Sequence, residues 1–144
     1  MNGYNNFKET GRWEIEALFS GRPGSLALYE AFEAAVLARH PGTEIRPAKT
    51  QVGFFDGCCY AVASPLTRWK RKYPGAAILI TLGLPERVES PRMEQATEPY
   101  PGRWTHHLVL TDAARIDKEL LCWLDAAYQF AQMKRRAPSR KGER

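Results

Sequence analysis

The sequence lacks any long hydrophobic run. No stretch of its 144 residues approaches the roughly twenty consecutive apolar residues that a membrane-spanning helix needs. Its first residues, Met1 to Asn6, show neither a basic start followed by an apolar segment nor the arginine-rich pattern of a transit peptide. Both absences predict a cytoplasmic protein without membrane association. Internal repeats are missing as well, and the composition excludes collagen-like, coiled-coil and low-complexity classes.

Cysteine is scarce. The chain has three cysteines, Cys58, Cys59 and Cys122, an odd number without CxxC spacing, which is typical of a reducing compartment. Cys58 and Cys59 are adjacent in a predicted strand, so their side chains point to opposite faces and cannot share a metal ion. One cysteine with one histidine of the pair His106-His107 supplies too few ligands for structural zinc. We therefore predict no metal centre.

The strong sequence motifs of catalysis are also absent. No glycine-rich phosphate loop follows a predicted strand, and neither HExxH nor GxSxG occurs. The sequence therefore predicts no cofactor, and it leaves the question of an enzyme open. A small hydrolase-like enzyme would depend on isolated residues: His107 as acid or base beside Glu94, Glu98 or Asp112, or Cys58 or Cys59 as nucleophile.

The charge of the chain is concentrated at its C-terminal end. Residues 134–144 contain six basic residues and one acidic residue, which account for the whole net charge of +5. With 44% hydrophobic residues, the rest of the chain is apolar enough to form one domain. We expect a flexible N-terminus at 1–12, a single domain at 13–133 and a disordered basic tail at 134–144. The tail either solubilises the protein or gives salt-sensitive binding to nucleic acid.

The spacing of apolar residues, and the glycine and proline residues that interrupt it, predict helices packed on a small sheet. A helix capped by Ser25 runs to His40, and a second helix begins after Thr111 or Asp112. Between them, five strands are predicted at 43–46, 50–55, 58–63, 76–84 and 104–110, whereas 85–102 is predicted to be a loop. This order favours an α+β fold, with an antiparallel or mixed sheet of about five strands and the N- and C-terminal helices packed on one face.

The dipeptide Asp56-Gly57 predicts a tight β-hairpin. If Phe55 pairs with Cys58, strand alternation divides the hairpin into two faces. We expect the smaller and more apolar set to face the core: Thr50, Val52, Phe54, Cys59, Ala61 and Ala63. Tyr60 then belongs to the opposite face.

Several short motifs resemble a bacterial family known as domain of unknown function 5655. They are Phe19-Ser20-Gly21-Arg22-Pro23, Lys49-Thr50-Gln51-Val52-Gly53-Phe54, Leu82-Gly83-Leu84, Ser90-Pro91-Arg92, Pro101 to His107, Asp117, Trp123-Leu124 and Ala127-Tyr128. The resemblance covers about residues 13 to 131. It implies a small α/β domain without an assigned activity, and it groups Lys49, Thr50, Arg92, Arg103 and His107 as polar positions.

Alternation along the last predicted strand distinguishes its two histidines. Leu108 and Leu110 mark a core face that includes His106, whereas His107 faces solvent or a cleft. We predict that Lys49, Arg92, Arg103 and His107 converge on one concave anion-binding patch, with Thr50 and Trp104 beside it. Alternatively, Arg92 and Arg103 pair with Glu89, Glu94 or Glu98 and only hold the loop down.

These observations favour a binding module for an anionic small molecule or a protein partner. The first alternative is a nucleic-acid-associated protein that uses the basic tail and the stretch Arg68-Trp69-Lys70-Arg71-Lys72-Tyr73, where cations alternate with aromatic rings. The same stretch equally fits a solvated loop whose aromatic rings cover the edge of the sheet. The sequence does not indicate an oligomeric state.

Overall fold

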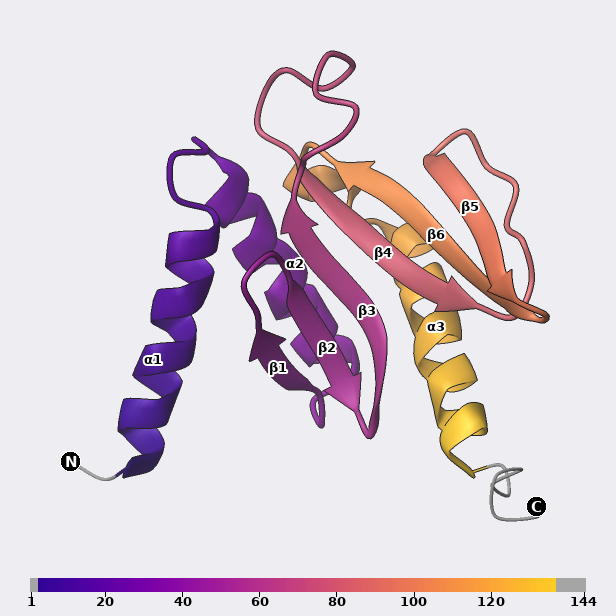
Figure 1. Cartoon of the computed structure of the whole chain (residues 1–144), viewed down its shortest axis with the longest axis horizontal. Helices are drawn as coiled ribbons and strands as arrows, with labels where there is room; N and C mark the ends of the chain where they lie inside the picture. The colour runs from indigo at the N-terminus through magenta and orange to yellow at the C-terminus, as the bar shows by residue number, and fades with distance from the viewer. Residues whose placement is uncertain (1–2, 137–144) are drawn as a thin grey trace.

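A computed structural model describes residues 3–136, shown in Figure 1. In chain order, its elements are α1 (Gly3–Leu18), α2 (Ser25–Arg39), β1 (Glu44–Pro47), β2 (Val52–Asp56), β3 (Cys58–Pro65), β4 (Ile78–Leu84), β5 (Met93–Tyr100), β6 (Arg103–Leu110), the 3₁₀ turn η1 (Ala113–Arg115) and α3 (Lys118–Arg136). No helix in this part of the chain is long and apolar enough to cross a membrane.

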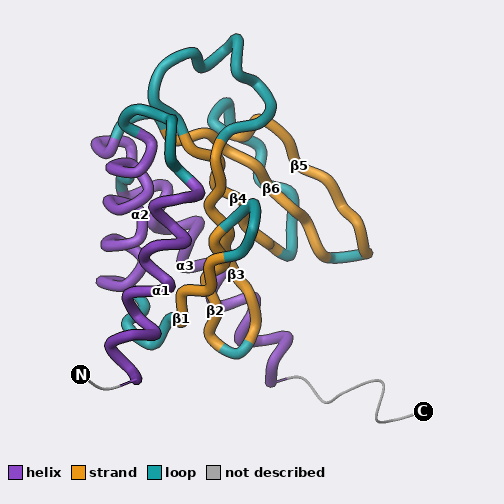
Figure 2. The backbone as a smooth tube through the Cα atoms, turned by 60° about the vertical axis from the view of Figure 1, so that its left-hand side comes forward, coloured by secondary structure: helices purple, strands orange, loops and turns teal. Residues whose placement is uncertain are grey.

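The six strands form one antiparallel sheet with the order β1-β2-β3-β4-β6-β5. Figure 2 shows the helices on one side of this sheet, and α1 lies next to the edge strand β1. The predicted α+β class, with helices on one face, is therefore confirmed. The sheet has one strand more than the five that the sequence predicts.

The core lies between the helices and the inner face of the sheet. Alternate residues of the central strands supply this face, because successive side chains of a strand point to opposite sides. Its fully buried members are Val52, Phe54, Ala63, Ile78, Ile80, Leu82, His106, Leu108 and Leu110. Phe32 of α2 meets the ring of Phe54 edge-on, with 5.5 Å between the ring centroids. Leu120 and Leu124 of α3 are also fully buried.

Strand β5 lies within the segment 85–102 that the sequence predicts as a loop. Its sequence, MEQATEPY, has no apolar alternation, because the strand lies at the edge of the sheet and its second half is exposed. Two irregularities interrupt its pairing with β6, between Met93 and Gln95 and between Thr97 and Tyr100. Such irregularities and charged or proline residues are common on exposed edge strands, so the usual strand pattern is missing here.

The hairpin of β2 and β3 forms as predicted, but its register differs by one residue. Phe55 pairs with Cys59 instead of Cys58, and a bulge lies next to it. The extra residue turns Tyr60 inward, where it is 3% exposed, and leaves Cys59 on the surface. The predicted core positions Val52, Phe54, Ala61 and Ala63 are confirmed. The prediction for Cys59 and Tyr60 is wrong, because a bulge shifts the alternation by one. Thr50, predicted for the same core face, is exposed in the turn before β2.

Three helix boundaries differ from the sequence predictions. Ser25 is the first residue of α2 and does not cap it. Asp112 caps η1, whereas Asp117 accepts a hydrogen bond from Leu120 N at the start of α3. α1 begins at Gly3, within the predicted flexible segment 1–12, and Arg12 donates to Glu33 at 2.7 Å.

The C-terminal prediction differs as well. α3 continues to Arg136, so the first residues of the predicted disordered tail are helical. The tail from 137 to 144 lies outside the described residues. The apolar stripe that predicts this helix stops near Ala131, and the basic residues after it therefore gave no sign that the helix continues.

Candidate functional site

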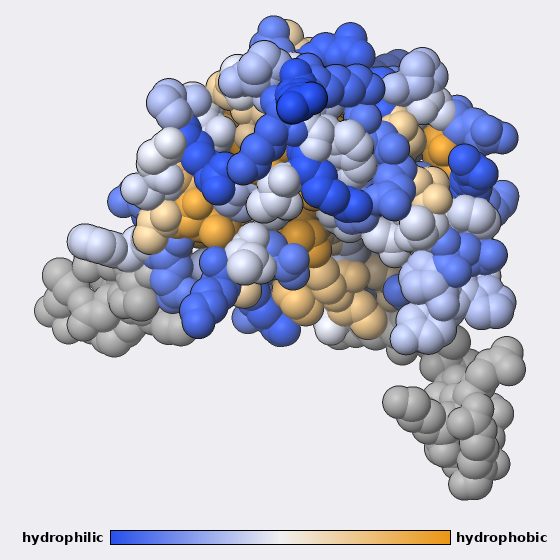
Figure 3. Space-filling model, turned by 45° about the horizontal axis from the view of Figure 1, so that its top comes forward, coloured by the Kyte–Doolittle hydropathy of each residue, from blue (hydrophilic) through white to orange (hydrophobic). Residues whose placement is uncertain are grey.

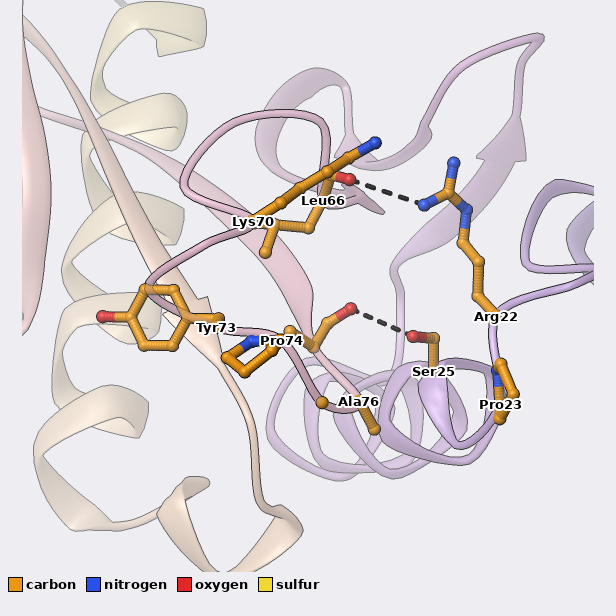
Figure 4. Close-up of a pocket in the computed structure, with 10 residues that line it drawn as sticks. Arg22, Pro23, Ser25, Leu66, Lys70, Tyr73, Pro74 and Ala76 are labelled. Atoms are coloured by element: carbon orange, nitrogen blue, oxygen red, sulfur yellow. Dashed lines mark hydrogen bonds between the residues drawn. The ribbon is translucent and has the colours of Figure 1, made fainter.

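A surface pocket of about 370 Å³ lies where the turn between α1 and α2 meets the long loop between β3 and β4. Figure 4 shows the residues that line it. They are Arg22, Pro23, Ser25, Leu66, Lys70, Tyr73, Pro74, Gly75, Ala76 and Ala77. Two are cations and none is an acid. The pocket thus combines apolar walls with positive charge.

The turn between α1 and α2 positions Arg22. Gly21 and Gly24 flank this residue with φ angles of 75° and 81°, which L-amino acids with a side chain rarely adopt. A Cβ atom added at Gly24 would lie 2.8 Å from the Cβ atom of Ala76, so this glycine lets the two loops touch. The Arg22 guanidinium donates to the carbonyl of Leu66 at 3.4 Å, across the pocket mouth (Figure 4).

A buried hydrogen bond fixes the same junction from inside. The hydroxyl of Ser25 donates to the carbonyl of Ala77 at 3.1 Å, and Ser25 is 4% exposed. This bond joins the first residue of α2 to the end of the loop. The backbone N–H groups at the start of α2 have no side-chain cap, so the partial positive charge of the helix end remains near the pocket.

The loop between β3 and β4 positions Lys70 by packing onto the outer face of the sheet. Leu66, Ala77 and Leu79 form a small buried cluster there, and Trp69 and Tyr73 pack against it. Trp69 has a φ of 62°, the only positive value outside glycine within residues 3–136. The rings of Trp69 and Tyr73 thus cover the outer face of the sheet. This agrees with the interpretation of residues 68–73 as a solvated loop whose aromatic rings cover the sheet.

An acidic residue of β5 holds the far side of the loop. The carboxylate of Glu94 accepts hydrogen bonds from the hydroxyl of Tyr73 and from the ammonium of Lys72, the latter at 3.0 Å. Burial alone would raise the pKa of Glu94, but these two donors outweigh it and lower that pKa. Glu94 is thus ionised at neutral pH and serves as an anchor.

Three cations of the two loops are not neutralised. Among the side chains that the structure describes, those of residues 11–134, no carboxylate forms an ion pair with Arg22, Lys70 or Arg71. Figure 3 shows strongly hydrophilic side chains gathered over the end of the molecule that carries this loop. Cations without a carboxylate partner around an open pocket attract an anion, because the negative charge of the anion balances theirs.

The structure does not bring the predicted site residues together. Lys49 and Thr50 lie in the turn between β1 and β2, and Arg103 follows the turn between β5 and β6. These turns lie at opposite edges of the sheet (Figure 1). Standard strand spacings separate Lys49 from Arg103 by roughly 20 Å or more. The predicted convergence on one patch is therefore wrong, because strand order places the two cations apart.

Arg92 is engaged with α3. Its guanidinium donates to Asp117 at 2.9 Å, to Glu119 at 3.0 Å and to the carbonyl of Arg115 at 2.9 Å. It also lies over the ring of Trp123, 5.6 Å from the centroid. The alternative prediction was that Arg92 pairs with a carboxylate of its own segment, namely Glu89, Glu94 or Glu98. The actual partners come from another element, and Arg92 ties the segment before β5 to the helix.

The two histidines of β6 lie on opposite faces, as predicted. His106 is fully buried, and its Nε2 atom accepts a hydrogen bond from Val88 N at 2.9 Å. Burial, with a smaller contribution from Arg87, lowers the pKa of His106. His107 is half-buried on the outer face, where Nδ1 lies 3.0 Å from the hydroxyl of Thr81. Burial and the charge of Arg68 lower the pKa of His107.

The other predicted residues have separate surroundings. Trp104 pairs with Leu84 at the end of β6 away from the pocket, and the guanidinium of Arg87 lies 6.0 Å from its ring centroid. Arg103 lies 6.0 Å from the ring centroid of Tyr100 and is exposed. That each of these residues binds a ligand stays a prediction, but Lys49 and Arg103 cannot hold the same small anion.

A polar cluster that the sequence analysis missed joins α2, β3 and α3. His40 stacks on Tyr128 with 4.0 Å between centroids, and its Nε2 atom lies 2.9 Å from Asp125. Tyr60 meets both rings edge-on and shares a 2.5 Å hydrogen bond with Thr43. Burial raises the pKa of Tyr60 to about 12. No local pattern signals this cluster, since the hydrogen bonds His40–Asp125 and Thr43–Tyr60 join residues 85 and 17 positions apart.

Chemistry with cysteine or metal has little support among the described residues. No group of three or more potential metal ligands occurs within residues 3–136. Although Cys59 reaches the surface, the protein around its sulfur partly desolvates it, which raises its pKa and disfavours the reactive thiolate form. His107 has Thr81 as its hydrogen-bond partner and no carboxylate within ion-pair distance in the described part of the chain. The carboxylates considered as partners of His107 are engaged elsewhere: Glu94 with Lys72, Glu98 with Gly102 N and Asp112 with Ala114 N.

The fold and the pocket define a small α+β domain with a cationic surface pocket. The chain belongs to the family described as Domain of unknown function (DUF5655), whose model matches residues 15–131. Searches among curated proteins and among solved structures give no match. Arg22 lies within this matched region, in the motif Phe19 to Pro23, but the sequence analysis did not place it among the candidate site residues.

Proposed function

We propose that this protein is a binding module for a small anionic ligand, and that the pocket between the α1–α2 turn and the β3–β4 loop holds it. The observation that carries the proposal is the pair Arg22 and Lys70. Both line a pocket without acidic residues, and neither has a carboxylate partner among the described side chains of residues 11–134. Figure 4 shows their charged ends at the same side of the pocket.

The packing of the two loops supports a preformed site. Ser25, Gly24 and Trp69 fix the backbone on both sides of the pocket, through a buried hydrogen bond, a close approach to Ala76 and apolar packing. A ligand therefore loses little affinity to ordering the protein, which is the usual advantage of a preorganised site. Arginine and lysine together suit an anion with several oxygen acceptors, such as phosphate or sulfate.

Thermal unfolding of the whole chain in phosphate, compared with chloride at equal ionic strength, tests the proposal. We expect phosphate to raise the melting temperature in a saturable way, because a ligand that binds only the folded state stabilises it. Arg22→Gln and Lys70→Gln should each abolish most of this rise. Arg71→Gln removes the same charge from the same loop outside the pocket, and it should keep the rise.

Two results would contradict this proposal. One is the absence of a specific phosphate effect. The other is an equal loss in the Arg71→Gln and Lys70→Gln variants, since that would mean diffuse attraction to a basic loop.

Nucleic-acid binding is the second candidate, supported by the exposed cations Arg68, Lys70 and Arg71. The rings of Trp69 and Tyr73 pack against the sheet, which leaves them unsuited to base stacking. We therefore expect any binding to single-stranded RNA or DNA to be electrostatic and to fall steeply with salt. Fluorescence anisotropy with the full chain and with a variant lacking residues 137–144 measures how much the tail contributes. Tight binding at physiological salt in both proteins would favour this candidate.

A further inference from the structure

The pocket has two chemically different parts. Arg22 and Lys70 supply positive charge from the two loops on either side. The rest of the lining is mostly apolar, with Tyr73, Pro74 and Ala76 along the β3–β4 loop (Figure 4). A ligand that fills the pocket would therefore need a charged end and an apolar body.

The uncharged polar side chains of the lining are already occupied. The Ser25 hydroxyl donates to the carbonyl of Ala77, and the Tyr73 hydroxyl donates to Glu94. The guanidinium of Arg22 makes one long hydrogen bond of 3.4 Å, so most of its donors are available. The lining side chains can thus bind an anion, but outside the two cations they have no free donor for a ligand body rich in hydroxyl groups. Buried polar groups left without partners reduce affinity.

The charge balance favours a dianion. Two cations line the pocket, and none of its lining residues is acidic. A phosphate monoester carries about two negative charges at neutral pH and presents three oxygen acceptors. A carboxylate carries one charge and would neutralise only half of the pair.

We propose that the pocket takes a phosphate monoester with a compact apolar body. Its phosphate lies between Arg22 and Lys70, and its body lies against Tyr73, Pro74 and Ala76. This inference rests on the proposed function and names the class of ligand. The volume of about 370 Å³ allows a body the size of one aromatic ring together with the phosphate.

Isothermal titration calorimetry with the full chain tests the ligand class through four probes: inorganic phosphate, phenyl phosphate, glucose 6-phosphate and benzoate. We expect phenyl phosphate to bind about tenfold more tightly than inorganic phosphate, because its ring buries apolar surface. Glucose 6-phosphate should bind no more tightly than inorganic phosphate, and benzoate should bind more weakly than phenyl phosphate. Arg22→Gln and Lys70→Gln should each weaken phenyl phosphate by about tenfold or more, and Arg71→Gln should not.

The outcomes separate the two proposals. Equal affinities for inorganic phosphate, phenyl phosphate and glucose 6-phosphate, all lost in Arg22→Gln, would overturn the apolar body and leave the anion site intact. Tighter binding of benzoate than of phenyl phosphate would overturn the phosphate assignment alone. Phenyl phosphate affinity unchanged by both Arg22→Gln and Lys70→Gln, in variants that unfold as cooperatively as the parent, would overturn the anion site as well.

Discussion

The backbone N–H of Val88 donates a hydrogen bond to the Nε2 atom of His106, with 2.9 Å between the two nitrogens. A ring nitrogen that accepts a hydrogen bond carries no proton, so the neutral ring must hold its proton on Nδ1. Nδ1 itself is buried and lacks a partner of good geometry within the described residues. The ring is therefore fixed as one neutral tautomer, and it anchors the segment between β4 and β5 over the inner face of the sheet.

This relationship predicts how stability depends on pH. Burial lowers the pKa of His106 in the folded chain, whereas an unfolded histidine titrates near 6.5. The unfolded state thus binds more protons below pH 6.5, and the free energy of unfolding should fall as the pH drops below that value. Above it, this contribution is fully present. Denaturant unfolding between pH 5 and 8 measures the effect.

The pKa of His107 is lowered as well, so it contributes in the same direction. A His107→Gln variant removes that second group, and we expect it to retain a decrease in stability below pH 6.5. Nuclear magnetic resonance of the His106 ring should show an unprotonated Nε2 down to pH values below 6.5. A ring that titrates at or above 6.5 would contradict the lowered pKa, and a neutral ring with its proton on Nε2 would contradict the tautomer assignment.

Arg92 is expected to matter for stability. Arg92→Ala removes donors to Asp117, Glu119 and the Arg115 carbonyl, and we expect a loss of about 1–3 kcal/mol in the free energy of unfolding. The matched variant Arg103→Ala changes an exposed residue, and its effect should stay within about 0.5 kcal/mol. Urea denaturation of both proteins measures the difference. Equal effects of the two substitutions would show that the contacts of Arg92 with α3 contribute nothing.

Alanine substitutions at the two glycines of the α1–α2 turn should distinguish the cost of backbone strain from the cost of a steric clash. Both have positive φ, but an added Cβ meets Ala76 at 2.8 Å for Gly24 and nothing within 4 Å for Gly21. Gly21→Ala should cost about 1 kcal/mol through backbone strain alone. Gly24→Ala should cost roughly 1–3 kcal/mol more, because the two loops must move apart. Thermal and denaturant unfolding of both variants give the comparison, and similar losses would mean that the junction yields easily.

Glu94 is expected to control the mobility of the β3–β4 loop. Glu94→Gln removes the charge that pairs with Lys72 and weakens the bond from Tyr73. Amide hydrogen exchange in residues 66–77 should become about tenfold faster or more, because local opening then costs less. Glu98→Gln is the matched control on the same strand, since among the described residues Glu98 accepts from Gly102 N at the β5–β6 turn and not from the β3–β4 loop. Unchanged exchange in the Glu94 variant would show that apolar packing alone holds the loop.

Local sequence signals were sufficient for much of the fold. The apolar stripe ending at His40-Pro41-Gly42 predicted α2, because proline cannot continue a helix. The Asp56-Gly57 dipeptide predicted the hairpin, and Gly57 does adopt a φ of 79°. Alternation around Leu108 and Leu110 placed His106 in the core, where it is fully buried. Each of these features depends on residues that are close in sequence.

The sequence by itself determined the α+β class, the helix-covered face of the sheet and the histidine faces. Tertiary structure alone decided the remaining features: the partners of Arg92, the inward position of Tyr60, the edge strand β5 and the pocket. Gly24 approaches Ala76, and Lys72 meets Glu94, because the β3–β4 loop folds back against the α1–α2 turn and across the sheet to β5. Periodicity reports which side of an element is apolar, whereas the partners of a side chain depend on packing between elements.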